Sequence, residues 1–122
     1  MEEIIIIYPQ KIRNIQCVES EFEGLEKSFE KISFILDFQQ IDLYPINDTD
    51  EIEIIVTNIN DSIKRTSNQF LDQLIGKSVF TTWKCVNSQG YFDLFILGIE
   101  TIRPTVSILC EGSSLKVWQC SL

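Results

Sequence analysis

Alternation of apolar and polar residues with a period of two is the feature that most constrains this chain. In residues 31–38 (KISFILDF) every second side chain is large and apolar, while most of the others are polar. This spacing is typical of a half-buried β-strand, because successive side chains of a strand point to opposite faces of the sheet. The same period recurs in residues 79–86. Strands are therefore expected to make up most of the fold.

A polar segment at residues 47–50 predicts the first hairpin. It reads Asn-Asp-Thr-Asp, and these short side chains hydrogen-bond to nearby backbone groups and so favour turns. The turn would join strands at 41–46 and 51–57. Pro45 has no N–H to donate to a neighbouring strand, so its strand should be an edge of the sheet or should end there.

Two further turns are expected in the second half of the chain. Residues 87–90 read Asn-Ser-Gln-Gly, which fits a type I turn with Gly in the fourth position. The strand after it, 91–99, is apolar on both faces, which indicates a central, covered strand. The second turn, at 111–114, would join the last two strands, at 105–110 and 115–120.

The apolar period changes to a helical one after residue 60. It predicts one helix within residues 61–75, with Gly76 as its end. Residues 10–23 fit a helix or a bent strand, and we favour the strand. The residues that carry the helical spacing are Ile63, Phe70, Leu71, Leu74 and Ile75.

These patterns together predict a single α+β domain over residues 1–122. The expected architecture is a mainly antiparallel, curved, meander-like sheet of about seven strands with one helix packed on one face. A chain of 122 residues, 44% of them hydrophobic, can bury one core of its own.

The charge is strongly acidic, with 10 basic and 18 acidic residues and a net charge of −8. Residues 1–61 hold 14 of the acids and only 4 of the bases. Such a field repels phosphate groups, so direct binding to nucleic acid or to an anionic membrane is not expected, whereas a basic protein would be attracted. The longest apolar run, 4–8, is too short to cross a bilayer. Acids at positions 2 and 3 argue against an export signal, so a cytoplasmic location is expected.

The sequence lacks the usual catalytic groups. It has no His, its five Gly residues are too far apart for a phosphate-binding loop, and its four Cys residues lack metal-ligand spacing. We therefore expect no enzyme, no metal and no cofactor, and reduced, buried thiols. Paired carboxylates leave one alternative, a carboxylate-based enzyme or a small-ligand-binding module with its pocket between the sheet and the helix.

Aromatic and polar residues around the 87–90 turn form a possible recognition hairpin, composed of Trp83, Asn87, Tyr91 and Asp93. The structural alternative is that they only build and pack the turn. The segment WKCVNSQGYFD, with the later EGSSLKVW, resembles an uncharacterised family of small single-domain bacterial proteins that carry W-x3-N-x-Q-G-Y-x-D. The resemblance spans residues 79–118 and implies a single bacterial domain without an assigned activity.

Size, charge and the missing catalytic groups are also those of immunity proteins of bacterial toxin systems. The resulting hypothesis is an inhibitor that covers the active site of a basic toxin, such as a nuclease, with carboxylates placed where phosphates would bind. The protein would be a monomer or a weak dimer formed through the Pro45 strand. The acids expected to meet the partner are Glu19, Glu21, Glu23, Asp48, Asp50, Glu51 and Glu53.

Overall fold

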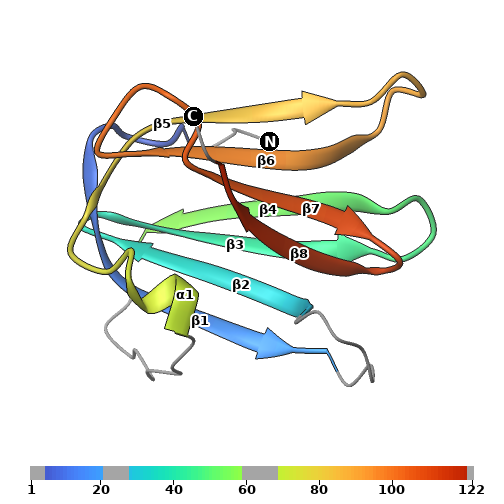
Figure 1. The fold of residues 1–122 in the computed structure, drawn as a ribbon, viewed down its shortest axis with the longest axis horizontal. Helices are drawn as coiled ribbons and strands as arrows, with labels where there is room; N and C mark the ends of the chain where they lie inside the picture. The colour runs from blue at the N-terminus through green and yellow to red at the C-terminus, as the bar shows by residue number, and fades with distance from the viewer. Residues whose placement is uncertain (1–4, 21–27, 59–68, 121–122) are drawn as a thin grey trace.

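The computed structural model describes residues 5–20, 28–58 and 69–120 (Figure 1). β-Strands contain most of these residues, and every pairing between them is antiparallel. The strands are β1 (Gln10–Glu19), β2 (Phe29–Leu36), β3 (Gln39–Ile46), β4 (Glu51–Asn58), β5 (Ser78–Val86), β6 (Phe92–Ile99), β7 (Val106–Glu111) and β8 (Ser114–Gln119).

Six of these strands close into an antiparallel barrel. β5, β6, β7 and β8 pair in chain order, and β1 joins β5 through Gln10 and Lys11. β1 also pairs with β2 along most of its length, and β2 meets β8 where Phe29 lies opposite Leu115, which completes the ring. β3 and β4 continue from the same edge of β2 as two extra strands. They lie behind β7 and β8 in Figure 1, with β4 against β6.

The predicted α+β class is wrong, because the protein is all-β. In the described part of residues 61–75 the helical structure is one turn, α1 (Gln69–Asp72), followed by hydrogen-bonded turns. Leu71 and Leu74 are buried in the barrel core from this short segment. Their helical spacing thus reflects two anchoring side chains one turn apart, and it does not reflect a helix that covers a sheet face. Ile63 lies outside the described residues.

The predicted strands and hairpins agree closely with the structure. Residues 10–19 form the strand β1, as favoured, and the turns at 47–50, 87–90 and 111–114 join the expected strands. The strand with Pro45 is not an edge, since β4 pairs with it and forms the outer strand. The pairing of β3 with β2 ends at Leu43, however, so Pro45 lies beyond it and leaves no N–H missing from that ladder.

The core fills the inside of the barrel with branched aliphatic and aromatic side chains. Alternate residues of each strand point inward, as the period of two requires. Phe34, Phe95, Ile12, Leu97 and Ile108 are among the fully buried residues. The register of the β5–β6 pairing shifts near Phe80 and near Asp93, as it does at a β-bulge.

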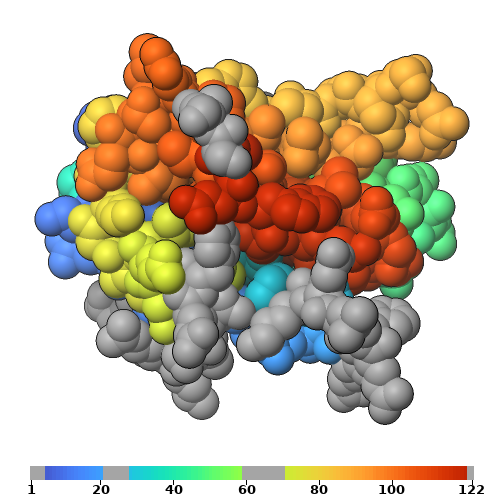
Figure 2. All heavy atoms as spheres, viewed as in Figure 1, coloured from blue at the N-terminus to red at the C-terminus, as the bar shows by residue number. Residues whose placement is uncertain are grey.

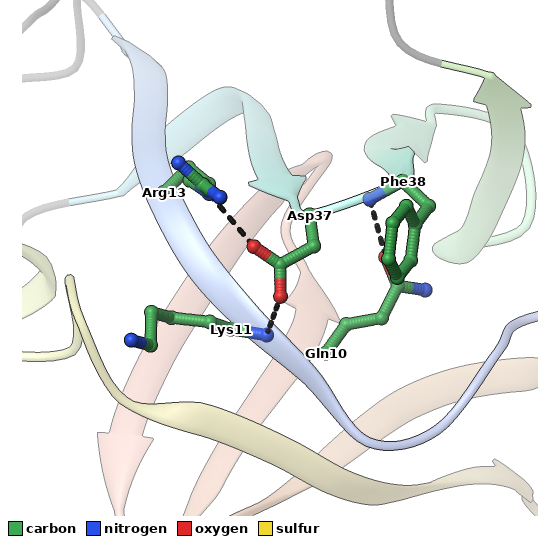
Figure 3. Close-up of polar contacts among 5 residues, drawn as sticks. All are labelled: Gln10, Lys11, Arg13, Asp37 and Phe38. Carbon is green, nitrogen blue, oxygen red and sulfur yellow. Dashed lines mark hydrogen bonds and ion pairs between the residues drawn. The ribbon is translucent and has the colours of Figure 1, made fainter.

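Side-chain hydrogen bonds close the end of the barrel where β2 turns into β3 (Figure 3). Asp37 accepts hydrogen bonds from the Arg13 Nε, at 2.7 Å, and from the Lys11 backbone N, at 3.0 Å. These contacts, the Arg13 bond first, lower the pKa of the Asp37 carboxyl. The Gln10 Oε1 accepts a hydrogen bond of 2.8 Å from the Phe38 backbone N.

Gln39 attaches the N-terminal segment to this end. Its Oε1 accepts from the Ile7 backbone N and its Nε2 donates to the Ile5 backbone O, both at 2.8 Å. The amide of Gln10 adds bonds of 2.8 Å to the Ile7 carbonyl and to the Gln39 Oε1. Two buried amide side chains therefore form the hydrogen bonds to the backbone of residues 5–7 that a neighbouring strand would otherwise form.

In the described part of the chain, we find no helix with the length and apolar character needed to cross a membrane.

Candidate functional site

Three turns lie at the same end of the barrel, which we call the hairpin end: residues 47–50, 87–90 and 111–114. In Figure 1 this end is on the right, where β3 meets β4, β5 meets β6 and β7 meets β8. β1 also ends there, and β2 begins there. The opposite end holds the start of β1 and the loop between β6 and β7.

The β3–β4 turn is fixed to the β7–β8 turn by two hydrogen bonds. The Ser113 backbone N donates to the Asp50 Oδ1, at 2.9 Å, and the Ser113 Oγ donates to the Asn47 carbonyl, at 3.4 Å. Asp50, Gly112 and Ser113 have positive φ values of 51°, 61° and 63°, which Gly adopts readily and other residues adopt in tight turns. These hydrogen bonds thus fix the position of the β3–β4 turn relative to the β7–β8 turn.

Cys110 is buried in β7, close to the β7–β8 turn. Burial raises the pKa of its thiol to about 11, and the charges of Asp50 and, more weakly, Asp93 add to the rise, whereas a hydrogen bond with the backbone of Ile46 opposes it. Carboxylates from two different hairpins therefore act on the same thiol. Because burial disfavours its thiolate, the Cys110 thiol packs in the core as a small apolar group.

The β5–β6 turn is built by the side chain of Asn87. Its Oδ1 accepts from the backbone N of Gln89, at 2.9 Å, and from that of Tyr91, at 3.2 Å. Its Nδ2 donates to the Asp93 Oδ2, at 3.1 Å. Asn87 and Asp93 thus stabilise the turn through their hydrogen bonds. The half-exposed Tyr91 side chain lies at the tip of the β5–β6 hairpin.

Acidic side chains dominate the hairpin end among the described residues. Asp48 and Glu53 are exposed and Glu51 is half-buried, and none of these three forms an ion pair with another described residue. Two lysines of this end are engaged: the Lys116 Nζ binds the Glu111 Oε1 at 2.8 Å, and the Lys31 Nζ lies 5.3 Å from the centre of the Tyr44 ring. The acids of the hairpin end are Glu19, Glu30, Asp48, Asp50, Glu51, Glu53, Asp93 and Glu111, and its described bases are Lys31, Lys84 and Lys116.

The opposite end carries the other described bases, Lys11, Arg13, Lys77 and Arg103. Its acids are fewer, and one of them, Asp37, is paired with Arg13. Among the described residues, the excess of negative charge therefore lies at the hairpin end.

A model for a protein family of unknown function, DUF6334, matches residues 1–121. The chain belongs to DUF6334. The match covers almost the whole chain, whereas the sequence motif pointed only to residues 79–118. No curated protein and no solved structure matches this DUF6334 chain significantly.

The predicted partner-binding acids of the DUF6334 chain come together in part. Asp48, Asp50, Glu51 and Glu53 share the β3–β4 hairpin, and Asp50 is partly committed to Ser113. Glu19 ends β1 at the same end of the barrel, with β2 between it and β3. Glu21 and Glu23 lie outside the described residues.

The predicted recognition hairpin does not form one surface. Asn87, Tyr91 and Asp93 lie at or beside the β5–β6 turn, but Trp83 lies opposite Ile96 on the outer face of the barrel. Trp83 therefore lies beside outward residues that are not part of the predicted recognition hairpin. These are Leu94, Ile96, Leu109 and Trp118, whose outward position follows from the alternation within their strands.

The described residues give little support to a carboxylate-based active site. A pocket of about 160 Å³ lies between the segment after α1 and the ends of β6, β7 and β8. Glu100 is the acid in its lining, and it is exposed. Asp42 is buried, but it lies elsewhere and accepts a hydrogen bond of 2.8 Å from the Gln40 amide. Among the described residues no group of three or more Cys, Asp and Glu side chains could hold a metal ion.

The four cysteines are free thiols, as expected from their spacing. Only Cys110 is fully buried, and Cys17, Cys85 and Cys120 are half-buried. The expectation of buried thiols therefore holds for one cysteine of the four.

Proposed function

We propose that this DUF6334 protein is a small cytosolic bacterial inhibitor of the immunity type, which binds a basic toxin domain with its hairpin end. The observation that carries the proposal is the gathering of acids there, three of which form no ion pair with a described residue. An active site that is shaped for phosphate groups is positively charged and accepts carboxylates in their place.

The hydrogen bonds that hold the turns of the hairpin end support the same proposal. The β3–β4 and β7–β8 turns are tied by the Asp50–Ser113 hydrogen bond, and Asn87 fixes the third turn through its own backbone contacts. A surface that is already ordered loses less conformational entropy on binding, so more of the interaction energy appears as affinity. Opposite fields also raise the association rate, because the partner is steered toward the acidic end.

The enzyme alternative has a weaker basis. It required a buried acid beside a pocket, whereas the acid that lines the pocket beside the segment after α1 is the exposed Glu100. We therefore assign no catalytic residue, metal or cofactor to the described part of the chain.

Capture of a partner from the native cell tests the proposal, with two matched charge reversals. Glu53→Lys changes the hairpin end, and Glu100→Lys makes the same charge change at the opposite end, where the side chain is also exposed. We expect a basic protein to be retained by the wild type and by Glu100→Lys, and to be lost with Glu53→Lys. Its toxic activity should stop when the wild-type protein is added in equal amount. Equal retention by both variants, or no basic partner at all, would overturn the proposal.

A further inference from the structure

The pocket beside the segment after α1 has an apolar floor and a polar rim. The floor consists of Leu74, Ile99 and Val106, which are all buried. In Figure 2 the segment after α1 (yellow), the β6–β7 loop (orange) and β8 (dark red) meet on the left of the molecule. A few polar groups around an apolar floor are typical of a site for a small molecule. The polar residues that line the pocket are Gln73, Lys77, Glu100, Thr105 and Gln119.

Two opposite charges line this pocket without pairing with each other. Lys77 and Glu100 come from neighbouring backbone segments, because the Glu100 backbone N donates to the Ser78 carbonyl at 2.8 Å. Both side chains are exposed, and neither forms an ion pair or a side-chain hydrogen bond with a described residue. The formal charges of the lining cancel, and each of the two groups is available to a ligand.

The backbone that carries these two charges is fixed by the barrel. The Lys77 carbonyl accepts a hydrogen bond of 2.8 Å from the Ile12 backbone N. Glu100 has a φ of 60°, a conformation that residues other than Gly rarely adopt. The loop that follows Gly98 folds back tightly, since a Cβ added at Gly98 would lie 2.6 Å from the Thr101 carbonyl oxygen. Such uncommon backbone conformations are frequent where a protein positions side chains for binding.

The size and charge of the pocket restrict its ligand. Its volume is about 160 Å³, and a protein cavity of about 150 Å³ holds one benzene molecule. An apolar group of about four to six carbon atoms therefore fits on the floor. The net charge of −8 repels an anion and draws a cation mainly to the hairpin end. A zwitterion carries no net charge, and it can use both charges of the rim.

We infer that this pocket binds a free amino acid with a branched apolar side chain. The ligand carboxylate binds the Lys77 ammonium, the ligand ammonium binds the Glu100 carboxylate, and the ligand side chain packs on Leu74 and Val106. The exposed Gln119 amide, which forms no side-chain hydrogen bond with a described residue, can donate to the ligand carboxylate. The pocket and the hairpin end lie at opposite ends of the barrel, so this binding is independent of the proposed function.

Titration of the full-length protein with L-leucine, followed by amide chemical shifts in NMR spectra, tests the inference. We expect saturable binding with a dissociation constant of about 1 mM or lower. The largest shifts should occur at residues 73–77, 99–106 and 119. Two leucine analogues separate the charges: 4-methylpentanoic acid lacks the ammonium and 3-methylbutylamine lacks the carboxylate. Each should bind at least about tenfold more weakly, because one of the two ion pairs is lost.

Three single variants locate the site. Lys77→Gln and Glu100→Gln each remove one charge of the rim, and each should weaken leucine binding at least about tenfold. Lys11→Gln makes the same change at an exposed lysine of the same end that does not line the pocket, and it should bind leucine as the wild type does.

The titration and the capture experiment can fail separately. Glu100→Lys should lose leucine and still retain the basic partner. The absence of saturation with leucine up to about 20 mM, equal binding of leucine and its two analogues, or unchanged binding in Lys77→Gln and Glu100→Gln would overturn the inference.

Discussion

Asp37 illustrates how one side chain can close one end of the barrel. It sits in the two-residue turn between β2 and β3 and binds both the Arg13 side chain and the Lys11 backbone, across the neighbouring strand β1 (Figure 3). These bonds favour the ionised carboxylate and lower its pKa. The carboxylate therefore stabilises the folded state only while it is charged.

This linkage predicts how Asp37→Asn changes the pH dependence of stability. Because the folded pKa is lowered, the stabilisation is complete above the unfolded pKa of about 3.9 and is lost as the pH falls through the folded value. We expect Asp37→Asn to lower the free energy of unfolding by roughly 1 kcal/mol at pH 7. The difference from the wild type should disappear in acid, below the folded pKa.

Denaturant unfolding between neutral and strongly acidic pH measures this difference. Asp48→Asn is the control, because Asp48 is exposed and forms no ion pair with a described residue. A constant difference between Asp37→Asn and the wild type at every pH would show that the Asp37 charge is not involved.

At the level of elements, the sequence predicted strands far better than the helix. Strand alternation is set by the backbone itself, and the turns of 47–50 and 87–90 are encoded by side chains that bond to their own backbone, as Asn87 does. The helical spacing of Leu71 and Leu74 reports only that two side chains one turn apart are buried. Two buried side chains at helical spacing occur both in a helix and in a single helical turn followed by a loop, so this spacing cannot distinguish the two.

β6 shows a second limit of sequence patterns. It is apolar on both faces, which predicted a central, covered strand. It is central, since β5 and β7 flank it, but Leu94 and Ile96 of its outer face are only half-buried. An apolar outward face can be covered by the same chain or by another molecule, and the sequence pattern is the same in both cases.

Gln39 provides a prediction for the N-terminal element. Its side-chain amide forms hydrogen bonds with the backbone of Ile5 and Ile7, and Gln39 is only 2% exposed. Gln39→Leu leaves the Ile7 N–H and the Ile5 carbonyl without this partner and removes one of the two hydrogen bonds that the Gln10 Nε2 donates. A buried polar group that loses its partner costs about 1–3 kcal/mol. We expect a loss of about 2 kcal/mol or more and faster hydrogen exchange at the Ile7 amide.

Gln73→Leu makes the same change at an exposed side chain and should alter stability by less than about 0.5 kcal/mol. Exchange at Ile7 and chemical unfolding are measured on both variants. Unchanged exchange at Ile7 in Gln39→Leu would mean that residues 5–7 are held by other contacts.

On the scale of the whole molecule, the barrel closure could not be predicted from the sequence. It depends on two short contacts between distant segments, Gln10 and Lys11 with β5 and Phe29 with Leu115, and no local pattern marks them. The candidate site is a product of that closure, because it brings together hairpins that are separate in the chain. The acids of 48–53 could be named from the sequence, but their position beside the β7–β8 turn could not.

The central claim is that the acids of the hairpin end drive association with a basic protein. The most direct test is the association rate of the captured partner with the wild type and with Asp48→Asn/Glu51→Gln/Glu53→Gln, at low and at high salt. Asp50 is left intact because it binds the Ser113 backbone. We predict that the triple variant associates about tenfold more slowly at low salt, and that its rate depends less on salt. Equal rates for the two proteins at both salt concentrations would contradict the account.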